Sequence, residues 1–353
     1  MRSLHRTHRP AGCLQSRAYA GEEALDFLQR SWPGLTDRDP AATAYQDPAW
    51  LRAWARHLPA SHEPLILAAV DTQTPVAALA LARETGRDGR TRVTPLSWPA
   101  GEQIRPVGDE TEEAVRVLLH HLPRLGDDVV AADLPEASLL TRQAQHQWGG
   151  PDSQMLYATV PLPVDLASMS RTTRRDHTRR RRTVQDLGGR VGYRRTRTTG
   201  ELLDAYELLE VLHHRRNAGR PAADGTADLN LPWRQVLAQC AQIAFIATLT
   251  LDTQAVAAQL CLRRGTHAYS VVTAMDPAVR ALAPGHALLH LLCEDLADDG
   301  CTALDLGRTA DDTGQRAYKS AYGALWTTVR TYTAPHPAHA QAAADRALSS
   351  AAP

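Results

Sequence analysis

Lys319 is the single lysine of a chain that contains thirty-eight arginines. An ammonium group is a compact charge with three rotatable donors, whereas a guanidinium is broad, planar and always protonated. Lys319 lies in the segment 315–323 (QRAYKSAYG), shortly after the strand-like segment 302–307 (TALDLG). The residue suits a point charge or a proton donor in a narrow pocket. A surface lysine without a role is the alternative, and the residue type alone leaves both open.

A strongly basic segment is the second feature that can do chemistry. Residues 171–197 carry eleven arginines and two aspartates, a charge of +9, so the rest of a chain with zero formal net charge carries about −9. Ser170 can cap a helix here and Gly188-Gly189 can end it, and only Val184 and Leu187 within it are apolar, so we expect an exposed helix. Arg171, Arg175, Arg179 and Arg182 form one stripe, with Arg174 and Arg181 beside it. The arginines favour contact with phosphate, in a tRNA acceptor stem or a nucleotide tail, over a solvated helix that bridges two domains.

Composition limits the class of protein. The chain has 353 residues, 43% of them hydrophobic and 22% charged, which suits a soluble globular protein with two domains. Five cysteines without a CxxC pair indicate a reduced compartment. The basic N-terminus has no apolar run and no segment has the length of a membrane span, so we expect a cytoplasmic protein.

Histidines and glutamate at helical spacing raise the question of a metal. His286, His290 and Glu294 are four residues apart on one predicted helix. That helix is rich in leucine and no cysteine completes the set, so we favour a core or boundary face. We therefore predict no metal and no tightly bound cofactor. The chain also has no P-loop, dinucleotide fingerprint or Ser-His-Asp arrangement.

The predicted elements occur in the same order twice. The first half has a helix (48–58), three strands (65–70, 76–83, 92–98), a helix (112–122), a strand (129–134), a helix (139–148) and a strand (155–162). The second half has a strand (190–196), two helices (201–216, 232–241), three strands (244–251, 256–264, 267–274), a helix (285–298), a strand (303–306), a helix (315–322) and a strand (326–333). Two similar sequences, DTQTPVAA at 71–78 and DTQAVAA at 252–258, each lie between two predicted strands, one in the first half and one in the second. A repeat of about 180 residues indicates a duplicated domain rather than a solenoid.

These patterns predict five segments. We expect a flexible N-terminal segment (1–40), a first domain (41–163), an arginine-rich helical linker (164–189), a second domain (190–334) and a flexible tail (335–353).

The element order of the second half resembles the GNAT acyltransferase fold. The short sequence motifs resemble those of the CelD-like branch of this fold, which is related to the Fem-type aminoacyl transferases. The resemblance implies an α/β (α+β) protein of tandem duplicated GNAT-like domains, each a mixed, mostly antiparallel sheet flanked by helices. It rests on 45–51 (YQDPAWL), the arginine-rich 172–186, Asp276-Pro277, Ala283-Pro284-Gly285, Asp305-Leu306-Gly307, Tyr318-Lys319 and Tyr322-Gly323.

One loop departs from the family pattern. Members that use acetyl-CoA usually place a turn of the form Gln/Arg-x-x-Gly-x-Gly/Ala before the long helix, where backbone N–H groups bind the pyrophosphate. Here Arg280 can open the pattern and Gly285 survives, but Pro284 removes a backbone donor. The resemblance therefore leaves room for a donor without pyrophosphate at this point, with Arg280, Gly285 and His286 as donor-binding candidates.

The resemblance also implies roles for single residues. Lys319 matches the Fem-type lysine beside the donor carbonyl and can stabilise the developing oxyanion or protonate the leaving group. Tyr318 is a candidate acid or a core aromatic, and Asp305 can orient Lys319, take the amine proton or cap a turn. Further candidates for donor or substrate binding are Arg308, as a carboxylate or phosphate clamp or a solvated loop arginine, and Tyr269 and Ser270 on the strand beside the donor.

Three functions remain open from the sequence. The first is an amide-forming transfer from aminoacyl-tRNA as co-substrate to a small-molecule amine, in small-molecule or cell-wall biosynthesis, with tRNA as partner. The second is an N-acetyltransferase that uses acetyl-CoA or another acyl-CoA. The third is a non-catalytic RNA- or nucleotide-binding protein, against which Lys319 in its motif argues.

Overall fold

The computed structural model describes residues 14–186, 190–217, 232–309 and 313–335. Within the helix at 171–186 it does not describe the side chains of residues 180, 181 and 183–185. Residues 1–13 of the predicted N-terminal segment lie outside this range, and so does the predicted flexible tail except for residue 335.

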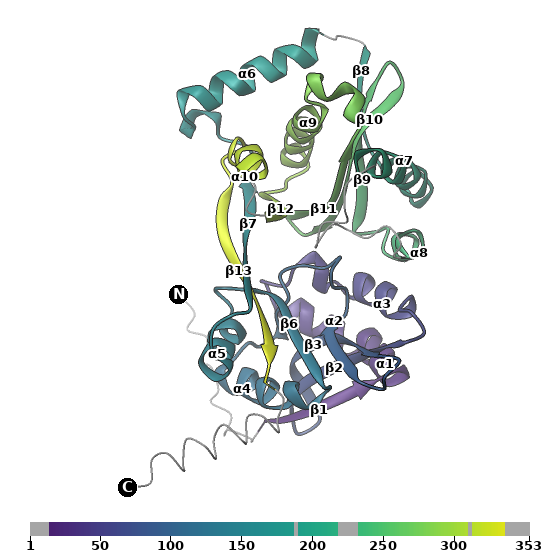
Figure 1. Cartoon of the computed structure of the whole chain (residues 1–353), viewed down its shortest axis with the longest axis vertical. Coiled ribbons are helices and arrows are strands. Elements are labelled where there is room, and N and C mark those ends of the chain that lie inside the picture. Colours follow the sequence, from purple (N-terminus) through teal and green to yellow (C-terminus); the bar gives the residue numbers. More distant parts are fainter. Residues whose placement is uncertain (1–13, 187–189, 218–231, 310–312, 336–353) are drawn as a thin grey trace, which may run out of the picture.

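Both halves of the chain contribute strands to one 13-stranded sheet (Figure 1). The first half contains β1 (Gln15–Ala20), α1 (Glu22–Arg30), α2 (Trp32–Arg38), α3 (Pro48–Arg56), β2 (His62–Asp71), β3 (Thr74–Thr85), β4 (Thr91–Pro95), β5 (Val107–Gly108), α4 (Glu112–His121), β6 (Asp128–Pro135), α5 (Leu139–Trp148) and β7 (Ser153–Pro161). The second half contains α6 (Arg171–Asp186), β8 (Val191–Arg195), α7 (Thr199–Asn217), α8 (Trp233–Gln239), β9 (Ala244–Leu251), β10 (Gln254–Arg264), β11 (His267–Met275), α9 (Pro284–Asp298), β12 (Ala303–Thr309), α10 (Thr313–Ser320) and β13 (Leu325–Ala334).

The predicted tandem duplication is confirmed by matching strand pairs. The antiparallel hairpin β2–β3 in the first half corresponds to β9–β10 in the second. The parallel pair β4–β6 corresponds to β11–β12, and a helix connects the two strands in each case, α4 in the first half and α9 in the second. Parallel neighbours need such a crossover, because a tight turn cannot join their ends.

The two halves exchange their last strands. β7 closes the first half in sequence but pairs with β12, whereas β13 closes the second half and pairs with β6. β7 and β13 also pair with each other, so the sheet runs without a break from one half to the other (Figure 1). Each exchange covers a strand edge that would otherwise present unpaired backbone groups.

One hydrophobic cluster spans both halves. It gathers α1, α2 and α3 of the first half and α7 and α8 of the second on one side of the sheet, at the right in Figure 1. Trp233 of α8 packs against Trp50 and Trp54 of α3, with ring centroids 6.0 and 5.3 Å apart. Separate clusters lie under α4 and α5 and under α9. The halves are therefore repeats of one unit with a shared core.

The prediction of a flexible segment at 1–40 is wrong for residues 15–38. β1 pairs with the edge of β2 from Gln15 to Ala20, and α1 and α2 follow. Phe27, Leu28, Trp32 and Leu35 are each no more than 4% exposed. Their spacing is that of a buried helical face, but arginine, proline and alanine around them conceal it in the sequence.

α6 lies inside the segment 164–189 that the sequence assigns to a helical linker. Across the residues that the structure describes, no helix has both the length and the apolar character needed to cross a membrane.

The shared core makes a prediction about unfolding. Trp233→Ala should lower the free energy of unfolding by about 3–5 kcal/mol, because the deletion leaves a cavity between α3 and α8. Leu208→Ala, at a side chain of α7 that is 47% exposed, is the matched control and should cost under about 1 kcal/mol. Urea denaturation followed by tryptophan fluorescence and by circular dichroism measures both. Two separate transitions in the wild-type protein would contradict a core that spans both halves.

Candidate functional site

The sheet opens where β11 and β12 part. The two strands pair in parallel only as far as Tyr269 and Asp305, whereas β12 continues to Thr309 with its other edge paired to β7. β11 also carries a bulge at this point: Cys261 pairs with Ser270 but Leu260 pairs with Val272, so Val271 is an extra residue. Bulges re-aim the backbone and often lie beside active sites. The structure thus places Tyr269, Ser270 and Asp305, all singled out by the sequence, at one opening.

A loop of the first half reaches this opening. Leu81, which is equivalent to Cys261 in the repeat, pairs with Pro95 at the end of β4, and the chain rejoins the same edge of β3 only at Val107 and Gly108 of β5. Residues 96–106 therefore leave the sheet at the place where β11 has its bulge. At the tip of this loop, Gln103 Nε2 donates to Asp305 Oδ2 at 2.5 Å.

Arg308 holds three groups of the first half. Its Nε lies 2.9 Å from Glu102 Oε1, its Nη1 lies 3.2 Å from Asp133 Oδ2, and its Nη2 donates to the Pro99 carbonyl at 2.5 Å. The arginine side chain is only 14% exposed. The alternative of a solvated loop arginine is thereby excluded, and the carboxylates that Arg308 binds in this structure belong to its own chain.

Lys319 is buried beneath β12. Its Nζ donates to the carbonyl oxygens of Leu306, Gly307 and Arg308 at 2.7, 2.9 and 2.8 Å, and lies 2.9 Å from Thr309 Oγ1. The residue is 7% exposed, which rules out a surface lysine. Burial lowers the pKa of Lys319 to about 8, against the opposing effect of Glu102 and Asp305. The ammonium fixes four consecutive residues of β12 beside the opening.

Asp305 is the most enclosed carboxyl of the group, at 4% exposure. Its Oδ1 accepts from the Gly307 N–H at 2.7 Å, and its Oδ2 accepts from Gln103 and from the Thr159 hydroxyl at 3.4 Å. Burial, reinforced by Glu102, raises its pKa well above the usual value. Asp305 joins β12 to β7 and to the loop of the first half.

Glu102 is a candidate residue that the sequence did not reveal. Its carboxyl accepts from Arg308 and from the Tyr157 hydroxyl. Gly307 adopts φ +70°, and a Cβ there would lie 2.8 Å from Glu102 Oε2, so only glycine lets the carboxyl approach β12 this closely. Burial, with Asp133 adding to it and Arg308 opposing it, raises the pKa of Glu102 to about 7. The available signal was an acidic residue in a Pro/Gly loop directly after a strand.

Tyr45 brings a second unforeseen group to the same place. It lies in a short 3-10 helix (Ala44–Gln46), is 1% exposed, and packs edge-to-face on Tyr269 with ring centroids 5.6 Å apart. Its hydroxyl interacts electrostatically with Glu102, Asp305 and Arg308 but makes no hydrogen bond to any residue that the structure describes. A buried hydroxyl without a partner is costly and needs a reason, such as a ligand.

Tyr318 belongs to a different group. Successive residues of a helix point about 100° apart, and while Lys319 faces β12, the Tyr318 hydroxyl donates to the Gly285 carbonyl at 3.1 Å. Its ring lies 4.6 Å from that of His286. With Thr173 and Asp176 of α6, Tyr318 and His286 line a hollow of about 320 Å³. The sequence candidates thus divide into one group around Lys319 and one at the start of α9.

The loop before α9 uses its own backbone donors. Residues Pro277–Leu282 form a 3-10 helix whose first N–H, at Ala278, is capped by the Asp276 carboxylate at 2.9 Å. Arg215 pairs with the same carboxylate at 3.1 Å. The N–H groups of His286 and Ala287 both donate to the Ala283 carbonyl. Arg280 is exposed on this helix.

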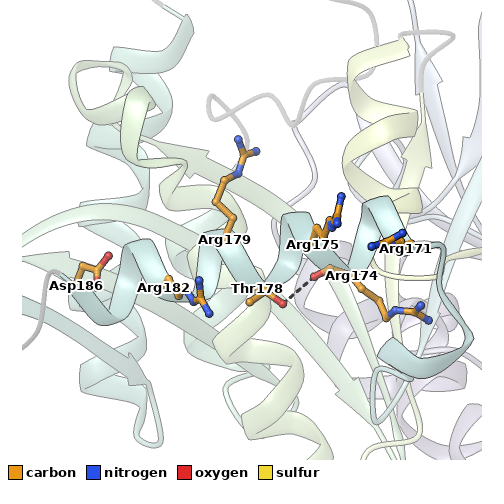
Figure 2. A pocket seen from close by; sticks show the side chains of 7 residues that line it. All are labelled: Arg171, Arg174, Arg175, Thr178, Arg179, Arg182 and Asp186. Atoms are coloured by element: carbon orange, nitrogen blue, oxygen red, sulfur yellow. Dashed lines mark hydrogen bonds between the residues drawn. The ribbon is translucent and has the colours of Figure 1, made fainter.

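The five arginines of α6 whose side chains the structure describes face outward (Figure 2). Arg171, Arg174, Arg175, Arg179 and Arg182 are exposed and surround a surface hollow of about 730 Å³. Arg181 lies in the helix, but its side chain is outside the described residues. Among the described side chains of α6 only His177 is buried, edge-to-face on Tyr322 with centroids 4.9 Å apart. α6 is thus anchored on one face and presents a basic surface on the other.

Metal ligands do not converge in the part of the chain that the structure describes, where no group of three or more His, Cys, Asp or Glu side chains is arranged to hold an ion. His290 instead lies 3.4 Å from Glu294 on the same helix.

A family model matches part of this sequence, and several solved structures are similar to this fold. A family model described as an acetyltransferase (GNAT) domain matches residues 171–320. Among solved structures, FemX has a TM-score of 0.61 at 12% identity and covers 93% of this chain and 99% of its own. L-PGS of Bacillus licheniformis has a TM-score of 0.58 at 14% identity and covers 87% and 91%. The C-terminal DUF2156 domain of a protein from Agrobacterium fabrum named as a lysylphosphatidylglycerol synthetase has 0.57 at 13%, and covers 92% and 96%.

No curated protein sequence matches this chain at a significant level. At such low identity the structural likenesses concern the fold, and they extend over both halves. The matched domain contains the opening between β11 and β12, with Lys319 at its end. Residues 171–320 therefore match an acetyltransferase (GNAT) domain, and the fold of the chain over both halves is similar to the folds of FemX and L-PGS.

Proposed function

We propose that this acyltransferase moves an aminoacyl group from aminoacyl-tRNA to the amine of a small acceptor. The observation that carries the proposal is the loop before α9, because several of its backbone N–H groups are already paired within the loop. A pyrophosphate needs several free N–H groups at a helix N-terminus. Here Pro284 has no N–H, and the N–H groups of Ala278, Ala283, His286 and Ala287 are already paired.

Charge at the same loop supports a donor other than CoA. The Asp276 carboxylate already binds the Ala278 N–H and the Arg215 guanidinium, two groups that could otherwise bind a phosphate. The exposed arginines of α6 instead offer positive charge over an open surface hollow. Such a surface suits the phosphates of a nucleic acid backbone, which bind arginine without regard to sequence.

The structural neighbours favour the same chemistry. One of them is named as a lysylphosphatidylglycerol synthetase, a name that describes the attachment of an amino acid to an acceptor. FemX and this protein share the fold over nearly the full length of both chains. We infer that the acceptor here is a small-molecule amine and that the reaction belongs to small-molecule or cell-wall biosynthesis.

Lys319 is the residue we place closest to the reaction. Its ammonium is held by three carbonyls of β12, so its charge is fixed beside the opening before any substrate arrives. Preorganised charge of this kind stabilises an oxyanion without reorganisation in the transition state. We assign Asp305 the task of holding β12 in register with the first half, and Tyr318 that of shaping the start of α9.

An acyl-CoA-dependent N-acetyltransferase is the second candidate. The description of the matching family model favours it, as do the retained Arg280 and Gly285. The 320 Å³ hollow beside His286 and Tyr318 is the place where such a donor would meet α9.

The donor can be tested directly. Purified protein is incubated with bulk tRNA charged with radiolabelled amino acids, or with acetyl-CoA, in the presence of primary amines. We expect labelled amide from the charged tRNA, abolished by prior RNase treatment, because the α9 loop offers few donors to CoA. Product from acetyl-CoA that survives RNase would replace the first proposal with the second.

The basic surface predicts steep salt dependence of tRNA binding. Affinity should fall strongly between 50 and 200 mM salt, in the manner of proteins that contact several phosphates. Arg175→Gln together with Arg182→Gln should make the log–log slope shallower by about one to two. Arg30→Gln with Arg87→Gln, exposed arginines of the first half, is the control. Filter binding across a salt series measures the slopes, and equal slopes in both double variants would assign α6 no part in binding.

Lys319 predicts a joint loss of rate and stability. Lys319→Met should lower kcat about a hundredfold or more, and should destabilise the fold by about 1–3 kcal/mol because buried carbonyls lose their donor. Lys319→Arg should rescue poorly, since a planar guanidinium cannot place one nitrogen among four oxygens. Arg316→Met on the same helix is the control. Wild-type kcat and melting temperature in Lys319→Arg would remove Lys319 from the mechanism.

A further inference from the structure

We propose that Glu102, carried by the first half of the chain, accepts the proton of the acceptor ammonium at the transfer site of the second half. This inference rests on the proposed amide-forming function but does not depend on which donor supplies the acyl group.

The path of the chain delivers Glu102 to the site. The strand of the first half that corresponds to β11 stops pairing with β3 at Pro95, and the chain returns to β3 at Val107. The excursion is fixed at several points: Ile104 N–H donates to the Asp133 carbonyl, and Arg308 holds Pro99 and Glu102. In the second half the same position holds a bulge beside the opening. The loop that interrupts this strand therefore places the Glu102 carboxyl beside the second half.

Glu102 lies against the segment that carries the other site residues. Its carboxyl contacts Arg308, and the position of a Cβ on Gly307 would be 2.8 Å from Glu102 Oε2. Gly307 O in turn accepts from Lys319 Nζ. A carboxylate offers about four lone pairs, so each oxygen of Glu102 can accept one more hydrogen bond beside those from Arg308 and Tyr157.

The other two carboxyls are less suited to proton exchange. Asp305 already accepts from three donors and is 4% exposed. Asp133 is 5% exposed and pairs with Arg308 from β6. Glu102 is the least enclosed of the three, at 9%. Its pKa of about 7 also allows it to take and return a proton near neutrality, as a general base requires.

Tyr45 gives an independent sign that a polar ligand enters here. Its hydroxyl is buried, lies in the electrostatic field of Glu102, Asp305 and Arg308, and lacks a hydrogen-bond partner among the described residues. An amine beside Glu102 would supply that partner. The three carboxyls and two cations of the cluster sum to minus one when all are ionised, which favours a cationic guest.

The proposed reaction is balanced. The acceptor R–NH₃⁺ gives one proton to the Glu102 carboxylate and becomes the neutral amine. The amine nitrogen attacks the donor carbonyl, forming the C–N bond, and the C–O bond of the aminoacyl ester (or the C–S bond of a thioester) then breaks. The nitrogen loses its second proton to solvent, and the protonated Glu102 gives its proton to the leaving oxygen or sulfur. The carboxylate is restored, and the products are an amide, an alcohol or thiol, and one released proton.

The kinetic test compares Glu102→Gln with wild type, using charged tRNA and acetyl-CoA as parallel donors and primary amines as acceptors. We expect kcat to fall about a hundredfold or more, with donor KM unchanged and the acidic limb of the pH profile lost. Glu63→Gln, a half-exposed partner of Arg83 on another face, should behave as wild type. If the wild type forms product from acetyl-CoA and Glu102→Gln slows that reaction, the role of Glu102 is supported while the tRNA donor is overturned. The two proposals therefore fail separately. Wild-type kcat and pH profile in Glu102→Gln would overturn the role of Glu102.

Two further measurements guard against a merely structural effect. Glu102→Asp withdraws the carboxyl by one methylene, so kcat should fall while the acidic limb remains; an unchanged kcat would overturn the proposal even if Glu102→Gln failed to fold. Tyr45→Phe should fold at least as stably as wild type but raise the acceptor KM several-fold, because the amine loses a hydrogen-bond partner. An unchanged acceptor KM would overturn the assignment of Tyr45 and the place of the amine beside it.

Discussion

Arg308 is the interaction on which the geometry of the site depends. It is one side chain of β12 that binds two carboxylates and a carbonyl of the first half. Removing a buried charge from its partner costs several kcal/mol, so the two halves cannot separate at this point without exposing or stranding three charges. The loop at 96–106, β6 and β12 are therefore held in one arrangement, and the opening between β11 and β12 has a fixed wall.

The two copies of the fold differ at the strand that borders this opening. In the second half β11 runs unbroken along β10, with a single bulge at the opening. In the first half the matching strand is split into β4 and β5, and residues 96–106 leave the sheet between them. A copy whose strand is interrupted there has lost the continuous wall of its own opening. The exchanged strands β7 and β13 join the two copies in one sheet, and that loop contacts β12 of the intact copy through Pro99, Glu102 and Gln103.

Local patterns made much of the fold predictable. The similar hairpin sequences at 71–78 and 252–258 and the alternating apolar strands indicated the repeat. Lys319 was a candidate because it is the only lysine in the sequence. Three features could not be predicted, because non-local contacts create them. β7 and β13 pair with the opposite half, Glu102 becomes a site residue only through the Arg308 contact, and β1 is a strand because β2 offers it an edge.

Two groups of side chains differ in charge: a buried cluster rich in carboxyls at the opening, and the exposed arginines of α6. The cluster at the opening holds three carboxyls against Arg308 and Lys319, so it disfavours a phosphate group, and burial raises the pKa of Glu102 and of Asp305. Phosphate groups are instead suited to the exposed arginines of α6, which His177 anchors against Tyr322 near the start of α9. In the function proposed above, the phosphates of the donor bind to α6 and only its uncharged acyl carbon enters the opening. A cationic acceptor, as proposed above, would be attracted to the carboxyls of the cluster, so donor and acceptor would be held by charges of opposite sign.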